Sequence, residues 1–338
     1  IFALLLCVFV FSCSNDDDKE TSSLQIVSSN VTFESAGGTG TIKVNAISEI
    51  TATSNKDWCT VSVNGDIINV SVIENNDMSG RTAAVTITDG EASTLVPVSQ
   101  GGCVILYNKS ESGHAFTYAG GSATVSFSTT ASYSIEVPAE AQSWLSYTLD
   151  EENRTITFNV AASADKTPRG AAVKVTAGKK TIYYHLGEYE LKDIAGKWRV
   201  SFVDGDDSTL AGEIEVVQDE EEPTIFYLSG ISNFFDLPLI YNGEALLTMG
   251  GLNLGTYAGR YNIYTVTLSE GGYVSWDMST QYVAYPSSIN GKFALVFGDN
   301  GSWDGDVVNG IAYWAFSGAA GTGSAGWLEK FNALTLSK

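Results

Sequence analysis

The sequence predicts an all-β protein: two tandem immunoglobulin-like β-sandwiches, residues 24–102 and 103–188, followed by an antiparallel β-barrel-like domain, residues 189–338. Three observations support this prediction. A unit of roughly 85 residues occurs twice. Short segments alternate between apolar and polar residues, and clusters of Gly, Asn and Asp separate them. The sequence shows no 3.6-residue apolar period over a useful length, which excludes long amphipathic helices.

The repeat shows in four pairs of segments, whose offset drifts only from 83 to 88 residues. The pairs are "FESAGGTGTIKV" (33–44) with "FTYAGGSATVSF" (116–127), "WCTVSV" (58–63) with "WLSYTL" (144–149), "INVSV" (68–72) with "ITFNV" (156–160), and "RTAAVTIT" (81–88) with "RGAAVKVT" (169–176). The two copies are therefore one structural unit used twice.

Each copy contains a tryptophan and an arginine at matching places. Trp58 and Trp144 each begin a strand, where an anchor in the core between two sheets is favoured over an exposed platform for sugars. Arg81 and Arg169 each come just before a predicted strand, where a paired, structural arginine is expected.

These features are similar to the BACON domain, a small β-sandwich that recurs in surface proteins of Bacteroidetes. They are the Phe-x-x-Ala-Gly-Gly opening, the strand-initial Trp, "VIENNDMSGRTAAVTIT" (72–88) and the closing "VPVSQGG" (96–102). The second copy has "YYHLG" (183–187) where the first has "PVSQG", and it lacks the closing Gln. The resemblance implies a sandwich fold and an association with carbohydrate, although many such domains look like spacers and a shared fold transfers no binding site.

The last 150 residues contain more acidic, glycine and aromatic residues than the two repeats before them. Eight or nine strands with polar loops between them predict a closed or nearly closed antiparallel barrel, because closure removes exposed strand edges. The first strand begins at Trp198, and the other candidates are 212–218, 224–229, 244–249, 260–268, 273–276, 292–298, 310–316 and 331–337.

The opening of this domain resembles two kinds of barrel. "GKW" (196–198) is similar to the Gly-x-Trp that opens the first strand of lipocalins. The segment 228–247 fits better with C-terminal barrel domains, of unknown function, in other Bacteroidetes lipoproteins. A lipocalin-like carrier would hold a small apolar ligand in a cavity, whereas a filled barrel interior would favour a surface binder.

Residues 1–12 are predicted to be a signal peptide. The apolar run to Phe11 is shorter than the roughly 20 residues that span a bilayer, and its length fits the apolar region of a secretory signal. A buried core strand is the alternative, but the acidic stretch that follows argues against it. The chain does not begin with Met, so we expect its true start to lie upstream.

The segment Val10-Phe11-Ser12-Cys13 resembles a bacterial lipobox, with Phe11 bulkier than is usual. The resemblance implies that Cys13 carries lipid and that residues 13–23 form a lipidated acidic tether, and several acyl chains on one residue anchor a protein stably. The acids after Cys13 resemble the tag that sends Bacteroidetes lipoproteins to the outer face of the outer membrane. We therefore expect a lipid-anchored protein exposed on the cell surface.

The formal net charge is −21, of which residues 189–338 carry −12. Such a surface repels phosphate backbones, so no nucleic-acid partner is expected. Acidity that only keeps an exposed protein soluble would be a sufficient explanation.

Four cysteines are present. Cys7 lies in the signal segment and Cys13 is the lipidation candidate. Cys59 and Cys103 could form a disulfide in an exported protein, but Cys59 matches Leu145 in the second copy. A buried free thiol is therefore the favoured role of Cys59.

The sequence predicts no enzyme and no cofactor. His114 and His185 occupy different parts of the repeat, so each is expected to be an ordinary surface or strand residue. The chain shows no nucleophile elbow, phosphate loop or Cys-x-x-Cys motif. Paired carboxylates of glycoside hydrolases are defined by distance in space and leave no mark in a sequence.

One acidic loop is a candidate metal site. The loop "DNGSWDGD" (299–306) offers Asp299, Asp304 and Asp306 as oxygen ligands of the kind that Ca²⁺ prefers. The loop lacks the spacing and the final Glu of an EF-hand, so a solvated turn is the favoured reading.

Aromatic side chains in polar, glycine-rich loops are the candidate ligand-binding residues. Trp303 is the strongest, and Trp327 and Tyr257 lie in similar surroundings. The apolar face of a sugar stacks on such rings while Asp and Asn bind its hydroxyls. Folding back to cap the barrel is the alternative for each ring. Tyr183 and Tyr184 point to opposite faces of a strand, so at most one of them is exposed.

The functional hypothesis is a non-catalytic surface lipoprotein that binds a glycan or polysaccharide, or displays a recognition domain on a stalk of β-sandwiches. Two alternatives stay open. One is a lipocalin-like carrier, and the other is an adhesin or assembly subunit whose acidic barrel binds a protein partner.

Overall fold

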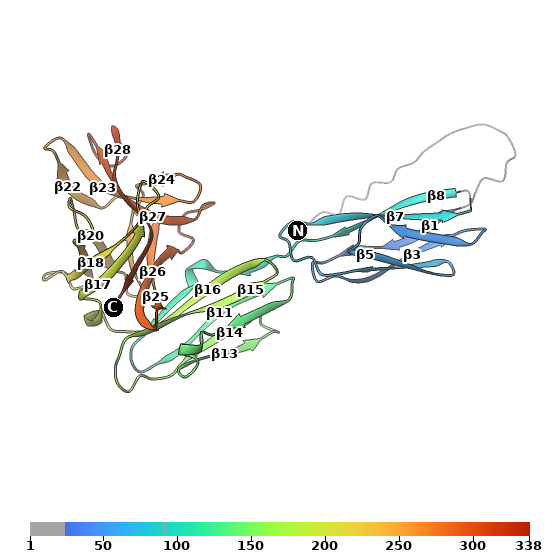
Figure 1. The fold of residues 1–338 in the computed structure, drawn as a ribbon, viewed down its shortest axis with the longest axis horizontal. Coiled ribbons are helices and arrows are strands. Elements are labelled where there is room, and N and C mark those ends of the chain that lie inside the picture. Colours follow the sequence, from blue (N-terminus) through green and yellow to red (C-terminus); the bar gives the residue numbers. More distant parts are fainter. Residues whose placement is uncertain (1–23, 91) are drawn as a thin grey trace. The chain divides into compact units, whose positions relative to one another are not determined.

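A computed structural model of the chain describes residues 24–90 and 92–338, and their regular structure is almost all strand (Figure 1). The predicted signal peptide 1–12 and the tether with Cys13 lie outside the described residues. The described chain forms two compact units, one of residues 24–75 and 79–102 and one of residues 76–78 and 103–338. The short 3-10 helices are η1 (Lys109–Glu111), η2 (Ala139–Ala141) and η3 (Leu191–Asp193).

The first unit is a β-sandwich, as predicted. Its two four-stranded sheets have the orders β1-β3-β6-β5 and β2-β8-β7-β4. Alternate residues of β3 are buried, among them Ile42 and Val44, so the period-two pattern of the sequence is the inward face of a sheet. The strands are β1 (Gln25–Asn30), β2 (Thr32–Phe33), β3 (Gly38–Asn45), β4 (Ile50–Ser54), β5 (Cys59–Asn64), β6 (Ile67–Val72), β7 (Arg81–Asp89) and β8 (Ala92–Gln100).

The second sandwich repeats this topology. Its sheets have the orders β13-β14-β11-β9 and β10-β16-β15-β12, which match those of the first copy strand for strand. The β15–β16 pair keeps the register of the β7–β8 pair, with Arg169 opposite Glu188 as Arg81 is opposite Gln100. The strands are β9 (Ile105–Tyr107), β10 (Gly113–Phe116), β11 (Gly121–Thr129), β12 (Tyr133–Glu136), β13 (Leu145–Asp150), β14 (Thr155–Val160), β15 (Arg169–Ala177) and β16 (Lys180–Glu188).

The tryptophan and arginine of the first copy form a structural lock, and Arg81 is a paired arginine, as predicted. The guanidinium carbon of Arg81 lies 4.4 Å from the centroid of the Trp58 ring, and Arg81 Nε donates to Gln100 Oε1 at 2.8 Å. The Gln100 amide in turn donates to the carbonyls of Ser35 and Ile73. One buried glutamine thus joins the strand end to two loops.

The second copy builds the same lock with a charge. Arg169 lies 4.6 Å above the Trp144 ring and forms an ion pair with Glu188, whose side chain is fully buried. Glu188 occupies the place of the Gln that the second copy lacks. The closing position is therefore conserved in role while its chemistry changes from an amide to a carboxylate.

Both described cysteines are free thiols. Cys59 is 2% exposed in the core of the first sandwich, and Cys103 is fully buried in the core of the second. The buried thiol is confirmed for Cys59, and the alternative of a Cys59–Cys103 disulfide is wrong.

The C-terminal domain closes into a ring of antiparallel strands ordered β17-β18-β19-β20-β21-β25-β26-β28. Pairing of β17 with the last residues of β28 completes the ring. The first half of β28 instead pairs with β27, which continues through β23 to β22 as an extension of the same sheet. The strands are β17 (Gly196–Val203), β18 (Thr209–Gln218), β19 (Ile225–Ser229), β20 (Leu237–Tyr241), β21 (Leu246–Met249), β22 (Asn253–Tyr257), β23 (Tyr261–Ser269), β24 (Val274–Ser275), β25 (Gln281–Ile289), β26 (Lys292–Asp299), β27 (Val308–Phe316) and β28 (Ser324–Ser337).

Large side chains pack the interior of this ring. Trp198, Phe226 and Tyr282 are at most 2% exposed within one continuous core, and the Trp198 indole donates to the Ile194 carbonyl at 2.7 Å. The Tyr282 hydroxyl accepts from the backbone N–H of Leu334 at 3.1 Å. This filling favours a surface binder over a carrier that would hold its ligand inside.

Candidate functional site

The three aromatic residues predicted from the sequence lie at three different places on the C-terminal domain. Trp327 lies on β28 at one end of the barrel and is 45% exposed. Tyr257 ends β22 and is 37% exposed. Trp303 lies in the loop between β26 and β27, where it is half-buried and packs against the barrel core.

Trp327 projects beside an irregularity in its strand. Trp327 pairs with Trp314 and Glu329 pairs with Tyr313, so Leu328 is an extra residue that makes a β-bulge. Bulges re-aim side chains at the rims of barrels. Here the side chains of Trp327 and Glu329 both line one hollow at the barrel end.

The turn between β17 and β18 packs closely against the six-membered ring of the Trp327 indole. A Cβ added to Gly205 would lie 2.7 Å from Trp327 Cζ3, closer than real Cβ atoms approach. Asp204 orders the turn, since its carboxylate accepts the N–H groups of Asp206 and Ser208, both at 2.9 Å. The close fit of ring and turn therefore depends on a glycine at position 205.

The hollow has a volume of about 300 Å³ and is lined by polar groups around one exposed indole. Its floor is the aromatic end of the barrel core, where the Phe202 and Phe331 rings meet edge to face at 5.0 Å. Its polar lining is Asp204, Asp206, Ser232, Asn233, Glu329 and Lys330. A rigid apolar base with carboxylate, amide and hydroxyl groups at its rim suits a ligand that is itself apolar on one face and hydroxylated at its edges.

Two charged side chains, Lys330 and Glu329, line this hollow. Lys330 Nζ lies 4.6 Å from the centroid of the Trp327 ring, a cation–π contact that covers part of one face of the indole. Burial raises the pKa of the Glu329 carboxyl, although a hydrogen bond with the Ser232 side chain lowers it. Glu329 lines the hollow, and its Oε2 atom is buried.

The loop 230–236 connects this hollow with Tyr257. Gly230 to Asn233 line the hollow, and the next residue, Phe234, packs edge to face on Tyr257 at 5.5 Å. Phe234 is 43% exposed and was not among the sequence candidates. The signal that could have identified it is "SNFFD", two adjacent aromatics inside a polar loop.

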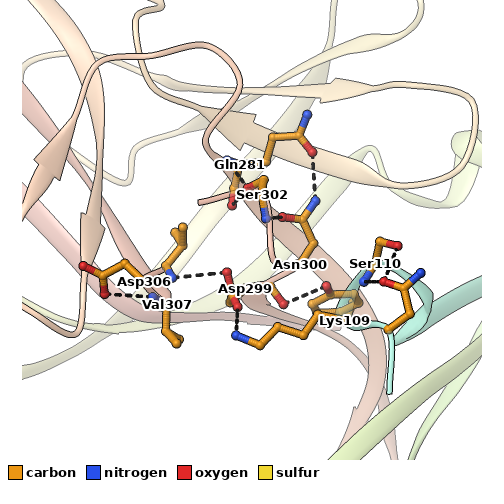
Figure 2. A network of polar contacts seen from close by, with 11 residues as sticks. Lys109, Ser110, Gln281, Asp299, Asn300, Ser302, Asp306 and Val307 are labelled. Atoms are coloured by element: carbon orange, nitrogen blue, oxygen red, sulfur yellow. Dashed lines mark hydrogen bonds and ion pairs between the residues drawn. The ribbon is translucent and has the colours of Figure 1, made fainter. Parts of the chain in front are cut away.

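Trp303 belongs to a loop that packs against the second sandwich. Figure 2 shows Lys109 donating to the Asp299 carboxylate, at 2.7 Å, and Asn300 and Ser302 bonded to Gln281. A hollow of about 440 Å³ beside Trp303 is lined by Lys109 and the loop acids. The indole fills space against the core, so the structure favours the capping alternative, and ligand binding by Trp303 stays a prediction.

Two of the acidic side chains of this loop, Asp299 and Asp306, have partners within the domain or the second sandwich. Asp299 pairs with Lys109 and also accepts the Val308 N–H, and Asp306 accepts the Val307 N–H at 2.8 Å. Hydrogen bonds to the Val307 N–H and the Ser269 hydroxyl lower the pKa of Asp306. Within the described ranges, no three His, Cys, Asp or Glu side chains are grouped as metal ligands. The hypothesis of Ca²⁺ on Asp299, Asp304 and Asp306 thus gains no support.

Other sequence candidates take structural positions. His114 and His185 lie on β10 and β16, and Tyr183 is 48% exposed while its neighbour Tyr184 is buried, as the alternation predicts. Among the described residues, no helix meets the length and hydropathy that crossing a membrane requires.

The family comparison matches both sandwiches. The family model BACON, described as "Putative binding domain, N-terminal", matches residues 48–101 and 132–183. A xyloglucan-specific endo-β-1,4-glucanase of Bacteroides ovatus is 30% identical over 103 residues, which are 28% of this chain and 20% of that protein. The chain thus matches about a fifth of the length of this curated relative.

Three solved structures show weak similarity. A Bacteroides ovatus GH5 xyloglucanase bound to a heptasaccharide matches with 26% identity, 24% of this chain, 19% of that chain and a TM-score of 0.22. A protein from Bacteroides thetaiotaomicron matches with 14% identity, 26% of this chain, 94% of that chain and a TM-score of 0.23. The titin domains I67–I69 match with 7% identity, 72% of this chain, 93% of that chain and a TM-score of 0.28. None of these scores carries an argument about function.

The fold and the family match define a class: an all-β protein in which two β-sandwiches match the BACON model over residues 48–101 and 132–183, followed by a further β domain that these matches do not reach. Its curated relative acts on a polysaccharide according to its name.

Proposed function

We propose that this protein binds a neutral glycan at the barrel end, with a sugar ring stacked on Trp327. The observation that carries the proposal is an exposed indole, fixed by Gly205 and Lys330, inside a rim of carboxylate, amide and hydroxyl groups. Stacking supplies the apolar contact, and the rim binds the hydroxyls.

The charge of the rim supports a neutral ligand. Asp204, Asp206 and Glu329 line the hollow with a single lysine, and that lysine already contacts the indole. Sulfated or uronic sugars would meet like charges there. The polysaccharide named for the curated relative makes xyloglucan oligosaccharides the first ligands to test.

We further propose that the protein is a non-catalytic lipoprotein of the outer membrane, exposed on the cell surface and anchored through Cys13. The lipobox-like segment before the acidic tether supports this proposal. A glycan binder attached to a membrane through a tether and two sandwiches would retain polysaccharide near the cell without cleaving it.

The test is a glycan array of neutral and acidic glycans, probed with protein in which Cys13→Ala prevents lipidation. We expect binding to neutral glycans that Trp327→Ala reduces at least tenfold. Tyr273→Ala is the matched control, because Tyr273 is an aromatic residue of the same domain that is 67% exposed and lies outside the hollow.

Trp303→Ala separates the two candidate sites. Loss of binding in that variant, with Trp327→Ala unaffected, would move the site to the loop between β26 and β27. No binding to any glycan would refute the proposal and favour a protein partner for the acidic barrel.

A further inference from the structure

Strand β25 (Gln281–Ile289) is buried on both faces, although a strand in a barrel wall needs only one buried face. All residues from Tyr282 to Ser287 are buried. Tyr282 and Ala284 face the barrel core. The opposite face of β25 lies against strands β10, β15 and β16 of the second sandwich, within the same compact unit.

Three consecutive residues of β25 each lie on a glycine of the second sandwich. A Cβ added to Gly113 would lie 2.6 Å from Tyr285 Cε1, and one on Gly187 would lie 3.0 Å from Pro286 Cγ and nearer still to its Cβ. A Cβ on Gly170 would lie 2.5 Å from the backbone N and 2.6 Å from the backbone O of Ser287. Contacts this short leave no room for a side chain at any of the three positions.

Directed contacts surround this glycine surface. The Tyr285 ring stacks on the His185 ring, with centroids 5.0 Å apart and 18° between the planes. The Tyr285 hydroxyl donates to the Asp299 carbonyl at 3.0 Å, and the Asp299 carboxylate pairs with Lys109 of the sandwich (Figure 2). The strand is therefore oriented by polar and aromatic groups as well as by fit.

The first sandwich has side chains at the matching positions. Its β7–β8 pair sets Thr82 opposite Ser99, where the β15–β16 pair sets Gly170 opposite Gly187 in the same register. Both residues carry a Cβ, and Thr82 is exposed. The second copy thus has a flat glycine surface at these positions. The first copy has side chains at the same backbone positions, and they would block a closely packed strand.

We infer that Gly113, Gly170 and Gly187 form a docking surface specific for β25, which makes the second sandwich and the barrel one rigid body and excludes the first sandwich from that role. The two repeats therefore have different tasks despite a common fold. The barrel end with Trp327 moves with the second sandwich, whether or not it binds a glycan.

The test transfers the first copy's residues into the second. Gly170→Thr with Gly187→Ser should separate barrel and sandwich, and Thr82→Gly with Ser99→Gly is the matched control in the first copy. In ¹⁵N relaxation of the whole protein, the wild type and the control should give one rotational correlation time for residues 105–337, and the transfer variant two. The pKa of His185, held at about 4 by burial, should rise by more than one unit in the transfer variant only.

Tyr285→Ala tests the same surface by removing the ring that contacts Gly113 and His185. This variant tests the inference if the transfer variant fails to fold. It should also give two correlation times, with the far-UV circular dichroism unchanged. A single correlation time in Tyr285→Ala, or in a folded transfer variant, would overturn the inference.

Discussion

The position of the Trp327 indole depends on Gly205, which has no side chain to displace it. We expect Gly205→Ala to push the ring away from the turn and to weaken binding of neutral oligosaccharides about tenfold, or ~1.4 kcal/mol. Isothermal titration calorimetry would measure the change. Gly212→Ala is the matched control, because a Cβ there meets open space in the adjacent strand. Equal affinities in the two variants would contradict the proposed stacking site.

Glu188 and Gln100 show how one position tolerates two chemistries. Glu188 is fully buried and paired with Arg169, whereas Gln100 bonds Arg81 without a charge. We expect Glu188→Gln to change the free energy of unfolding by less than about 1 kcal/mol, since the first copy already uses that pair. Glu188→Ala should cost about 3–5 kcal/mol, because it leaves Arg169 without its buried partner.

Chemical denaturation followed by tryptophan fluorescence would measure both variants. Equal costs for Glu188→Gln and Glu188→Ala would show that the carboxylate is required and that the two locks are not equivalent.

At the scale of elements, His185 gives the β16–β25 contact a dependence on pH. Burial against Tyr285 lowers the pKa of His185 from 6.5 to about 4. Between these values the unfolded chain binds more protons than the folded one, so stability rises with pH. The contribution is complete above about pH 6.5 and is lost as the pH falls toward 4.

We therefore expect the melting temperature to fall more steeply between pH 6.5 and 4 in the wild type than in His185→Gln. Calorimetry at several pH values would measure this difference, and carboxylates that titrate in the same range are common to both proteins. Parallel curves would mean that His185 is not protected by the barrel strand.

Strand β25 also shows where prediction from the sequence stopped. Strands such as β26 and β27 were predicted within two residues of their ends, because alternation marks a wall with one buried face. Strands β20, β22 and β25 were missed. In β25, "QYVAYPSSI" shows no alternation and contains a proline, because both faces are buried and β21 pairs only with its first residues, Gln281–Ala284.

At the scale of the whole molecule, charge sets which glycans can approach. Residues 189–338 contain 19 acidic and seven basic side chains. We expect affinity for neutral oligosaccharides to change less than twofold between about 50 and 500 mM salt, because stacking and neutral hydrogen bonds are not screened. Binding of sulfated oligosaccharides at low salt, measured by the same calorimetry, would contradict the neutral-ligand proposal.

By itself the sequence determined the all-β class, the duplicated sandwich, the paired structural arginine of each copy and the existence of a C-terminal barrel-like domain. These features follow from local patterns in the chain, namely alternation of apolar and polar residues, turn residues and repeated motifs. Only the tertiary structure decided that Trp327 meets Gly205, that β28 closes the ring on β17, and that glycines of one repeat receive β25. These contacts join residues about a hundred or more positions apart. Whether two surfaces fit depends on their shape in space, which local patterns do not encode.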